Sequence, residues 1–116
     1  MITKSSNTVT LNPLEIRQNL ALSQEGMSRL LRVSAKTIGR WEKGETKPDA
    51  QLKQPLAKLQ QIVELGHAVY TPEGLREFME TPLGVFDGQC ALDLITIGQY
   101  DRVIGVLASD YEGLGF

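Results

Sequence analysis

Reactive side chains are scarce in this sequence of 116 residues, which contains one cysteine and one histidine. A single cysteine excludes an intramolecular disulfide, and no apolar run reaches the roughly 20 residues that a membrane-spanning helix needs. The first ten residues, MITKSSNTVT, also lack the apolar stretch of a signal peptide. These absences predict a chain that works in the reducing cytoplasm and does not bind a membrane.

The same composition gives little indication of a catalytic site. A cysteine–histidine nucleophile would require Cys90 and His67 to converge with no obvious orienting group. We interpret His67 as a surface or helix-end residue and Cys90 as a small buried side chain near a helix start, a position that can lower its pKa without catalytic meaning. The sequence has neither a Gly-rich phosphate loop nor a set of metal ligands. We therefore expect no enzyme, no catalytic residue, no metal and no cofactor.

Charge is unevenly distributed along the chain, although the net charge is only −2. Residues 1–66 hold ten Lys and Arg against six Asp and Glu, whereas residues 67–116 hold two against eight. A basic first half and an acidic second half predict two surfaces with different partners, unless the segregation is a chance arrangement of solvated charge.

Helix-start signals divide the first half into short helices. Asn12 followed by Pro13 predicts a helix that runs through about Leu20. Ser23 is the expected cap of a second helix, QEGMSRLL, and Ser34 that of a third. The second helix carries one apolar stripe, formed by Met27, Leu30 and Leu31.

The third expected helix lies in the segment SAKTIGRWEKG, residues 34–44. At about 100° per residue, Ile38 and Trp41 point to one side of it and the cations Lys36, Arg40 and Lys43 to the other. Such a helix docks inward through its indole and presents charge outward, although an ordinary amphipathic helix with solvated lysines has the same pattern. Two short helices joined by a break of three or four residues, the second with a basic outer face, are typical of a helix-turn-helix.

The run LSQEGMSRLLRVSAKTIGRWEKGETKP resembles the helix-turn-helix of the Xre class of DNA-binding domains, which includes lambda repressor and Cro. The resemblance implies contacts with bases and phosphates by the outer face of the third helix and by the start of the second. Arg17 on the first helix and Lys47 after the third helix are expected to add contacts with the DNA phosphate backbone. The predicted DNA-binding residues are Arg17, Gln24, Ser34, Lys36, Thr37, Gly39, Arg40 and Lys43.

Three positions depart from this class. Gly26 lies inside the second helix, at a cost of about 1 kcal/mol relative to alanine. Arg32 occupies the turn position where the class usually has glycine, so we expect local strain there. Gly39 stands where the class often has a base-reading side chain, which predicts one contact fewer. A helix-turn-helix retained only for dimerisation is the alternative to DNA binding.

A longer helical pattern follows, starting at Pro48 and Asp49. Pro55 is expected to kink this helix or to begin a separate one, because proline lacks the amide donor. Its apolar stripe predicts core packing rather than a dimer zipper, which needs sustained heptads. We therefore predict an all-α protein. A helix-turn-helix domain of four to five helices, with a loose N-terminal arm and a connector helix, spans residues 1–66, and a small helical domain spans residues 67–116.

The second half shows further helix signals. Thr71 and Pro72 form a cap and first-turn pair for one helix, Gly88 precedes a second, and Gly98 ends that one before a last helix. The segments DLITI and VIGVL have enough β-branched residues to keep a strand as a minor alternative.

This half resembles the toxin-binding domain of the Xre/MbcA/ParS antitoxins. The likeness lies in a helix with an aromatic and apolar pair, a loop that begins with TP, and the run ALDLI followed by glycine. Phe78 stands where that family often has tryptophan, and Cys90 and Ala91 replace a usual proline. The matching positions are Phe78, Met79, Pro82, Phe86, Gly88, Ala91, Leu92, Leu94, Ile95, Gly98, Val103, Leu107 and Gly113.

The resemblance implies the antitoxin of a bacterial type II toxin–antitoxin pair. Such an antitoxin covers the substrate cleft of its cognate toxin, typically a RES-domain protein acting on NAD, and represses its operon by binding operator DNA. It is expected to form a homodimer or a larger hetero-oligomer with the toxin. The alternative is a free-standing regulator whose second half mediates dimerisation or senses a ligand. The predicted toxin-binding residues, unless the terminus is frayed, are Asp110, Tyr111, Glu112, Gly113, Leu114 and Phe116.

Overall fold

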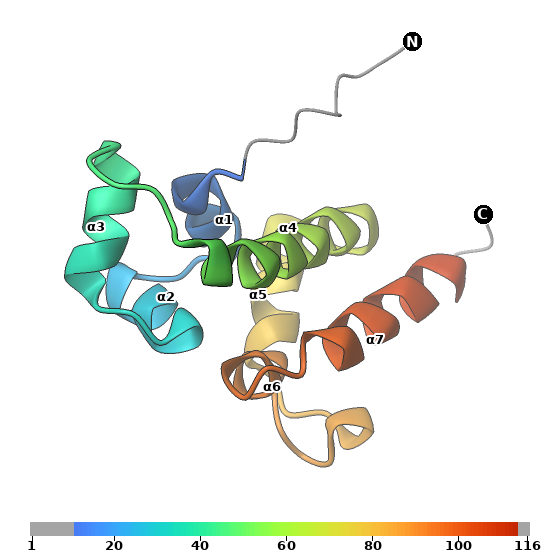
Figure 1. Cartoon of the computed structure of the whole chain (residues 1–116). Coiled ribbons are helices and arrows are strands. Elements are labelled where there is room, and N and C mark those ends of the chain that lie inside the picture. The colour runs from blue at the N-terminus through green and yellow to red at the C-terminus, as the bar shows by residue number, and fades with distance from the viewer. Residues whose placement is uncertain (1–10, 114–116) are drawn as a thin grey trace, which may run out of the picture.

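The chain forms seven α-helices and one 3-10 turn across residues 11–113, the part that the computed structural model describes (Figure 1). No strand occurs in this range, and the all-α prediction is confirmed, because DLITI ends α6 and VIGVL lies in α7. The elements are α1 (Pro13–Asn19), α2 (Gln24–Leu31), α3 (Ala35–Lys43), α4 (Ala50–Val69), α5 (Pro72–Glu80), η2 (Gly84–Phe86), α6 (Ala91–Thr96) and α7 (Tyr100–Gly113).

Four side-chain caps fix the starts of α1, α2, α3 and α5, as predicted. Asn12, Ser23, Ser34 and Thr71 each accept a hydrogen bond from a backbone N–H in the first turn, at 2.9 to 3.2 Å. These bonds satisfy amides that have no partner within the helix. Asp49 precedes α4, again as predicted, but its side chain makes no capping hydrogen bond.

Pro55 lies inside α4, which is a single helix from Ala50 to Val69. Of the two expectations for Pro55, a separate helix that begins there is therefore wrong. The proline removes the hydrogen bond to the carbonyl of Gln51, and Gln51 is exposed, so water can take the place of the missing donor. The predicted boundary between residues 66 and 67 falls inside this helix.

The turn between α2 and α3 contains the strained residue that the sequence predicts. Arg32 ends α2 in the left-handed conformation, with a φ of 60°, a region that favours glycine. Nη2 of its guanidinium donates a hydrogen bond to the carbonyl of Thr96 at the end of α6, 3.1 Å away. This bond ties the turn before α3 to the C-terminal half of the chain.

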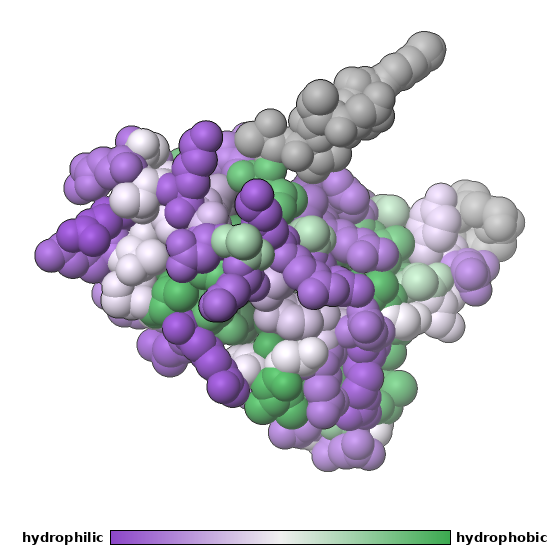
Figure 2. Space-filling model, viewed as in Figure 1, coloured by the Kyte–Doolittle hydropathy of each residue, from purple (hydrophilic) through white to green (hydrophobic). Residues whose placement is uncertain are grey.

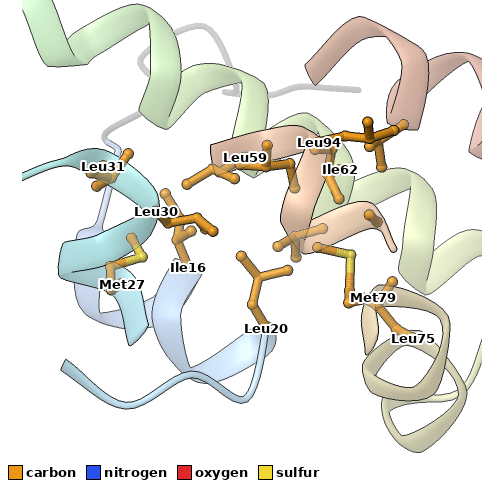
Figure 3. Close-up of a cluster of buried hydrophobic side chains, with 14 of the residues drawn as sticks. Ile16, Leu20, Met27, Leu30, Leu31, Leu59, Ile62, Leu75, Met79 and Leu94 are labelled. Atoms are coloured by element: carbon orange, nitrogen blue, oxygen red, sulfur yellow. The ribbon is translucent and has the colours of Figure 1, made fainter. Parts of the chain in front are cut away.

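One apolar core joins both halves of the chain. Figure 3 shows side chains from α1, α2, α4, α5 and α6 around a shared interior, among them Ile16, Met27, Ile62, Met79 and Leu94. Each of these five is at most 1% exposed. Full burial of such a side chain contributes roughly 1.5 to 3 kcal/mol. Hydrophobic burial therefore holds the two halves together.

The helix α4 is central to the arrangement. It packs against α1, against α5 and most extensively against α7, while α2 contacts α6. In Figure 1, α3 lies at one edge of the molecule and the C-terminal end of α7 at the opposite edge. None of the helices within residues 11–113 has the length and apolar character that crossing a membrane requires.

Candidate nucleic-acid interface

The outer face of α3 carries the cationic stripe that the sequence predicts. Lys36, Arg40 and Lys43 are exposed along this helix, with Gly39 between the first two. Figure 2 shows mainly hydrophilic surface at the edge where Figure 1 places α3. The helix therefore presents three positive charges along one side, which suits a polyanionic partner.

The inner face of α3 is fixed by burial. Ile38 is fully buried and Trp41 is only 7% exposed, so the indole is an anchor, as predicted. Gly44 ends the helix in the left-handed conformation, with a φ of 78°. A helix that enters a groove must be held rigidly on its other face, and these residues provide that support.

Glu42 is the one acidic residue in α3, and it binds residues of α1 and α2. Its carboxylate accepts two hydrogen bonds from the guanidinium of Arg17, at 2.6 and 3.0 Å, and a third from Nε2 of Gln24 at 2.9 Å. Arg17 also donates to the carbonyl of Leu22 at 3.0 Å. The hydrogen bonds from Arg17 lower the pKa of Glu42, against the opposing effect of burial. Because this negative charge is paired inside the first half, the stripe on α3 stays cationic.

Two residues that were predicted to contact DNA, Arg17 and Gln24, take part in this hydrogen-bond network. The side chain of Arg17 is 18% exposed, and its guanidinium already binds Glu42. Gln24 is half-buried and donates to the same carboxylate. Their contacts with DNA stay predictions. Sequence reasoning missed Glu42, and the available signal was its place beside Trp41, at the border of the buried face of α3.

Ser34 and Thr37 form a local pair at the start of α3. Their hydroxyl oxygens lie 2.8 Å apart, and the Ser34 oxygen also accepts a hydrogen bond from the Thr37 N–H at 3.0 Å. Ser34 is exposed and Thr37 is half-buried, while Lys47 is exposed in the loop after the helix. The predicted contacts of all three with DNA stay predictions.

A shallow hollow opens in the middle of the cationic stripe, with a volume of about 430 Å³. Five of the predicted DNA-binding residues come together around it. Its lining consists of Gln24, Ala35, Lys36, Gly39, Arg40, Lys43 and Glu45. The packing of α2 against α3 thus joins the start of one helix to the outer face of the other, the two regions in which the sequence places contacts with DNA.

The residues predicted to bind a toxin belong to α7 as far as the structure describes them. The last turn of that helix contains Asp110, Tyr111, Glu112 and Gly113. The Tyr70 hydroxyl at the end of α4 donates a hydrogen bond to Oδ2 of Asp110, 3.4 Å away. Two further predicted residues lie outside the described range, Leu114 and Phe116.

The C-terminal half also exposes two apolar side chains that sequence reasoning did not single out. Val85 on η2 is 59% exposed, and Ile97 at the end of α6 is 52% exposed. Arg102 of α7 fastens η2, because its Nη2 donates to the carbonyl of Val85 at 3.1 Å and to Asp87 at 3.3 Å. This half therefore combines an acidic composition with two exposed apolar side chains, of which Val85 lies on the segment that Arg102 binds.

Cys90 and His67 show no sign of nucleophilic chemistry. His67 is exposed in the last turn of α4, as predicted. Cys90 is half-buried rather than buried, and its Sγ donates to Oδ2 of Asp93 at 3.1 Å. Burial raises the pKa of the Cys90 thiol, so the expected lowering by the helix start is wrong. Among residues 11–113, no group of three or more His, Cys, Asp and Glu could hold a metal ion.

The chain is similar to known proteins over both of its halves. Residues 14–59 match the helix-turn-helix family. The chain is 24% identical over 97 residues to the mycobacterial cidal antitoxin MbcA of Mycobacterium tuberculosis, and equally to that of Mycobacterium bovis. These alignments cover 84% of this chain and 86% of each relative. The relatives form a non-enzymatic family, in agreement with the prediction that the chain is not an enzyme.

A solved structure shares the fold. It is a chain in the crystal structure of the Mycobacterium tuberculosis MbcT–MbcA toxin–antitoxin complex, which matches with a TM-score of 0.76 and 22% sequence identity. The match covers 90% of this chain and 95% of that one. The helix-turn-helix and the C-terminal helices therefore occur together, in the same arrangement, in another protein.

Proposed function

Since this chain carries a helix-turn-helix domain at residues 14–59 and is homologous to the MbcA antitoxins, we propose that it is the antitoxin of a toxin–antitoxin pair. The observation that carries this proposal is the extent of the similarity. The 97 aligned residues are more than residues 1–66 hold, so they include part of the acidic half. A likeness confined to the first half would support only a DNA-binding regulator.

The first half binds operator DNA and represses the operon. Here α3 enters the major groove, and its exposed Lys36, Arg40 and Lys43 neutralise phosphates or reach base acceptors. Proteins with this motif generally read paired half-sites, so the chain binds DNA as a homodimer. The contact surface is completed by Arg17, Gln24, Ser34, Thr37 and Gly39.

The second half binds the cognate toxin in the cytoplasm. Residues 67–116 hold two Lys and Arg against eight Asp and Glu, a balance that complements the cationic cleft of an enzyme that takes an anionic nucleotide. A RES-domain-like toxin acting on NAD has such a cleft, and the end of α7 covers it. The hydrogen bond between Tyr70 and Asp110 holds that end against α4. The residues that enter the cleft are Asp110, Tyr111, Glu112, Gly113, Leu114 and Phe116.

Co-expression tests this proposal. The chain is produced with the protein encoded by the neighbouring reading frame, and growth is measured with and without the chain. We expect rescue by the full chain, loss of rescue when the chain ends after Asp110, and unchanged DNA binding by that shortened chain. Normal rescue by the shortened chain would remove the C-terminal residues from the mechanism. Arg40→Ala combined with Lys43→Ala is the matched control, which should rescue growth but bind operator DNA weakly.

The same experiment addresses the alternative. A neighbouring protein that does not inhibit growth, and that does not bind the chain when the two are purified together, would favour a free-standing regulator over an antitoxin.

A further inference from the structure

Gly39 lies in the middle of the outer face of α3, although neither space nor backbone conformation requires glycine there. Its backbone is helical, and a methyl group at this position would meet only the side-chain amide of Gln24, at 3.9 Å, an ordinary van der Waals distance. Gly66 is different, because a methyl group there would lie 2.5 Å from Leu75. A glycine in a helix interior is less stable than alanine. Packing within the chain therefore does not account for glycine at this position.

Gly39, which has no side chain, lines the hollow in the cationic stripe. Lys36 and Lys43 lie one turn before and one turn after Gly39 on the same side of α3, and Arg40 is adjacent. Among the lining residues, Ala35 and Gly39 have the smallest side chains, and they lie one turn apart on α3. The hollow thus contains an alanine methyl group and a bare Cα among three cations, the Gln24 amide and the Glu45 carboxylate.

We propose that this hollow seats the 5-methyl group of a thymine when α3 lies in the major groove. The inference rests on the proposed DNA binding and adds the identity of a base to it. The thymine 5-methyl group is the apolar group that base pairs present in the major groove. The alanine methyl group and the bare Cα in the lining suit that group, while the three cations suit phosphates. Gly39 thus reads sequence by leaving space rather than by reaching a base.

Two matched glycine variants test this inference in the full chain. Gly39→Ala places a methyl group in the hollow, whereas Gly105→Ala adds one to the exposed middle of α7, where nothing lies within 4 Å. Each change should raise Tm by about 4 °C, because alanine favours the helix. The DNA probe is a duplex selected from a random pool by the wild-type chain. A second set of duplexes replaces each thymine in turn by deoxyuridine, which lacks only the 5-methyl group.

We expect one thymine at which deoxyuridine weakens wild-type binding by roughly fivefold. Gly39→Ala should weaken binding to the selected duplex by a similar factor and lose the sensitivity to deoxyuridine, while Gly105→Ala binds like wild type. If Gly39→Ala binds as tightly as wild type, or if no thymine is sensitive to deoxyuridine, the inference is overturned and DNA binding stands. A wild-type chain that selects no duplex would overturn the proposed function as well.

Discussion

The carboxylate of Glu42 binds side chains from two other helices, so this residue holds α3 against both α1 and α2. The Glu42 side chain is 9% exposed and that of Arg17 is 18% exposed, so solvent screens this pair less than a surface salt bridge. Because the hydrogen bonds from Arg17 lower the pKa of Glu42, the pair stabilises the fold above the ordinary glutamate value of 4.5. That contribution is lost as the pH falls through the lowered pKa.

We therefore predict that Glu42→Gln decreases the free energy of unfolding by about 2 kcal/mol at neutral pH. The difference from wild type should shrink as the pH falls below 4.5, because Glu42 is then protonated in the unfolded chain first and in the folded chain below its lowered pKa. Urea unfolding at a series of pH values measures both effects. Glu45→Gln changes an exposed carboxylate just after α3 and should be neutral. A penalty for Glu42→Gln of equal size at acidic and neutral pH would contradict this account.

At the scale of the element, α3 combines a buried anchor with an exposed cationic stripe, so the proposed DNA binding and the stability of the fold can be altered separately. Arg40→Ala combined with Lys43→Ala should weaken operator binding and reduce the magnitude of the slope of log affinity against log salt by about 2. Each phosphate contact releases counterions when DNA binds, so the loss of two contacts lowers the number released. Both residues are exposed, so the free energy of unfolding should change by no more than about 0.5 kcal/mol. Fluorescence anisotropy at several salt concentrations measures the slope.

The matched control is Arg76→Ala, which removes an exposed cation from α5 and should leave DNA binding unchanged. Should the double variant on α3 bind with the wild-type affinity and salt slope, another surface must contact the DNA.

The helices themselves are predictable from sequence where their signals are local. Each confirmed cap is bound by an amide two or three residues further along, so a short window of sequence contains the whole interaction. Pro55 misleads because α4 packs against α1, α5 and α7, and that packing outweighs the local penalty of proline.

The candidate interface likewise has some features that the sequence reveals and others that depend on how the helices pack. The cationic stripe follows from the helical period alone, so its residues are visible in the sequence. Glu42 and Arg17 are 25 residues apart, and their pairing depends on how α1 and α3 pack. The hollow beside Gly39 likewise requires the placement of α2 against α3, which no periodicity reveals.

At the scale of the whole molecule, the two halves that differ in charge share one core. The change in charge near residue 66 falls inside α4, and apolar residues from both sides of it pack into the same cluster. Two surfaces with different partners stay a prediction from composition, and composition does not reveal that both halves contribute to one core. A segment of half this length buries only about 60% of the surface that its unfolded chain exposes, so its stability is marginal.

We accordingly predict a single cooperative unfolding transition. Trp41 is the only tryptophan, so its fluorescence reports the first half, whereas far-ultraviolet circular dichroism reports the helices of both. The two signals should give the same urea midpoint. A chain that ends after Val69 should be far less stable, because it would expose the buried Leu59, Ile62 and Val63 of α4. Two separated transitions in the full chain would show that the halves fold independently.

The hydrogen bond between Arg32 and Thr96 connects the turn before α3 to the end of α6. Arg32 lies in the turn between α2 and α3, and Thr96 is the last residue of α6, the helix before α7. A protein that displaced Thr96 on docking would release that turn. Linked equilibria are reciprocal, so DNA and the docked protein would then alter each other's affinity by the same factor. With the toxin and the operator proposed above as the two partners, the concentration of free toxin would set how tightly the chain holds the operator.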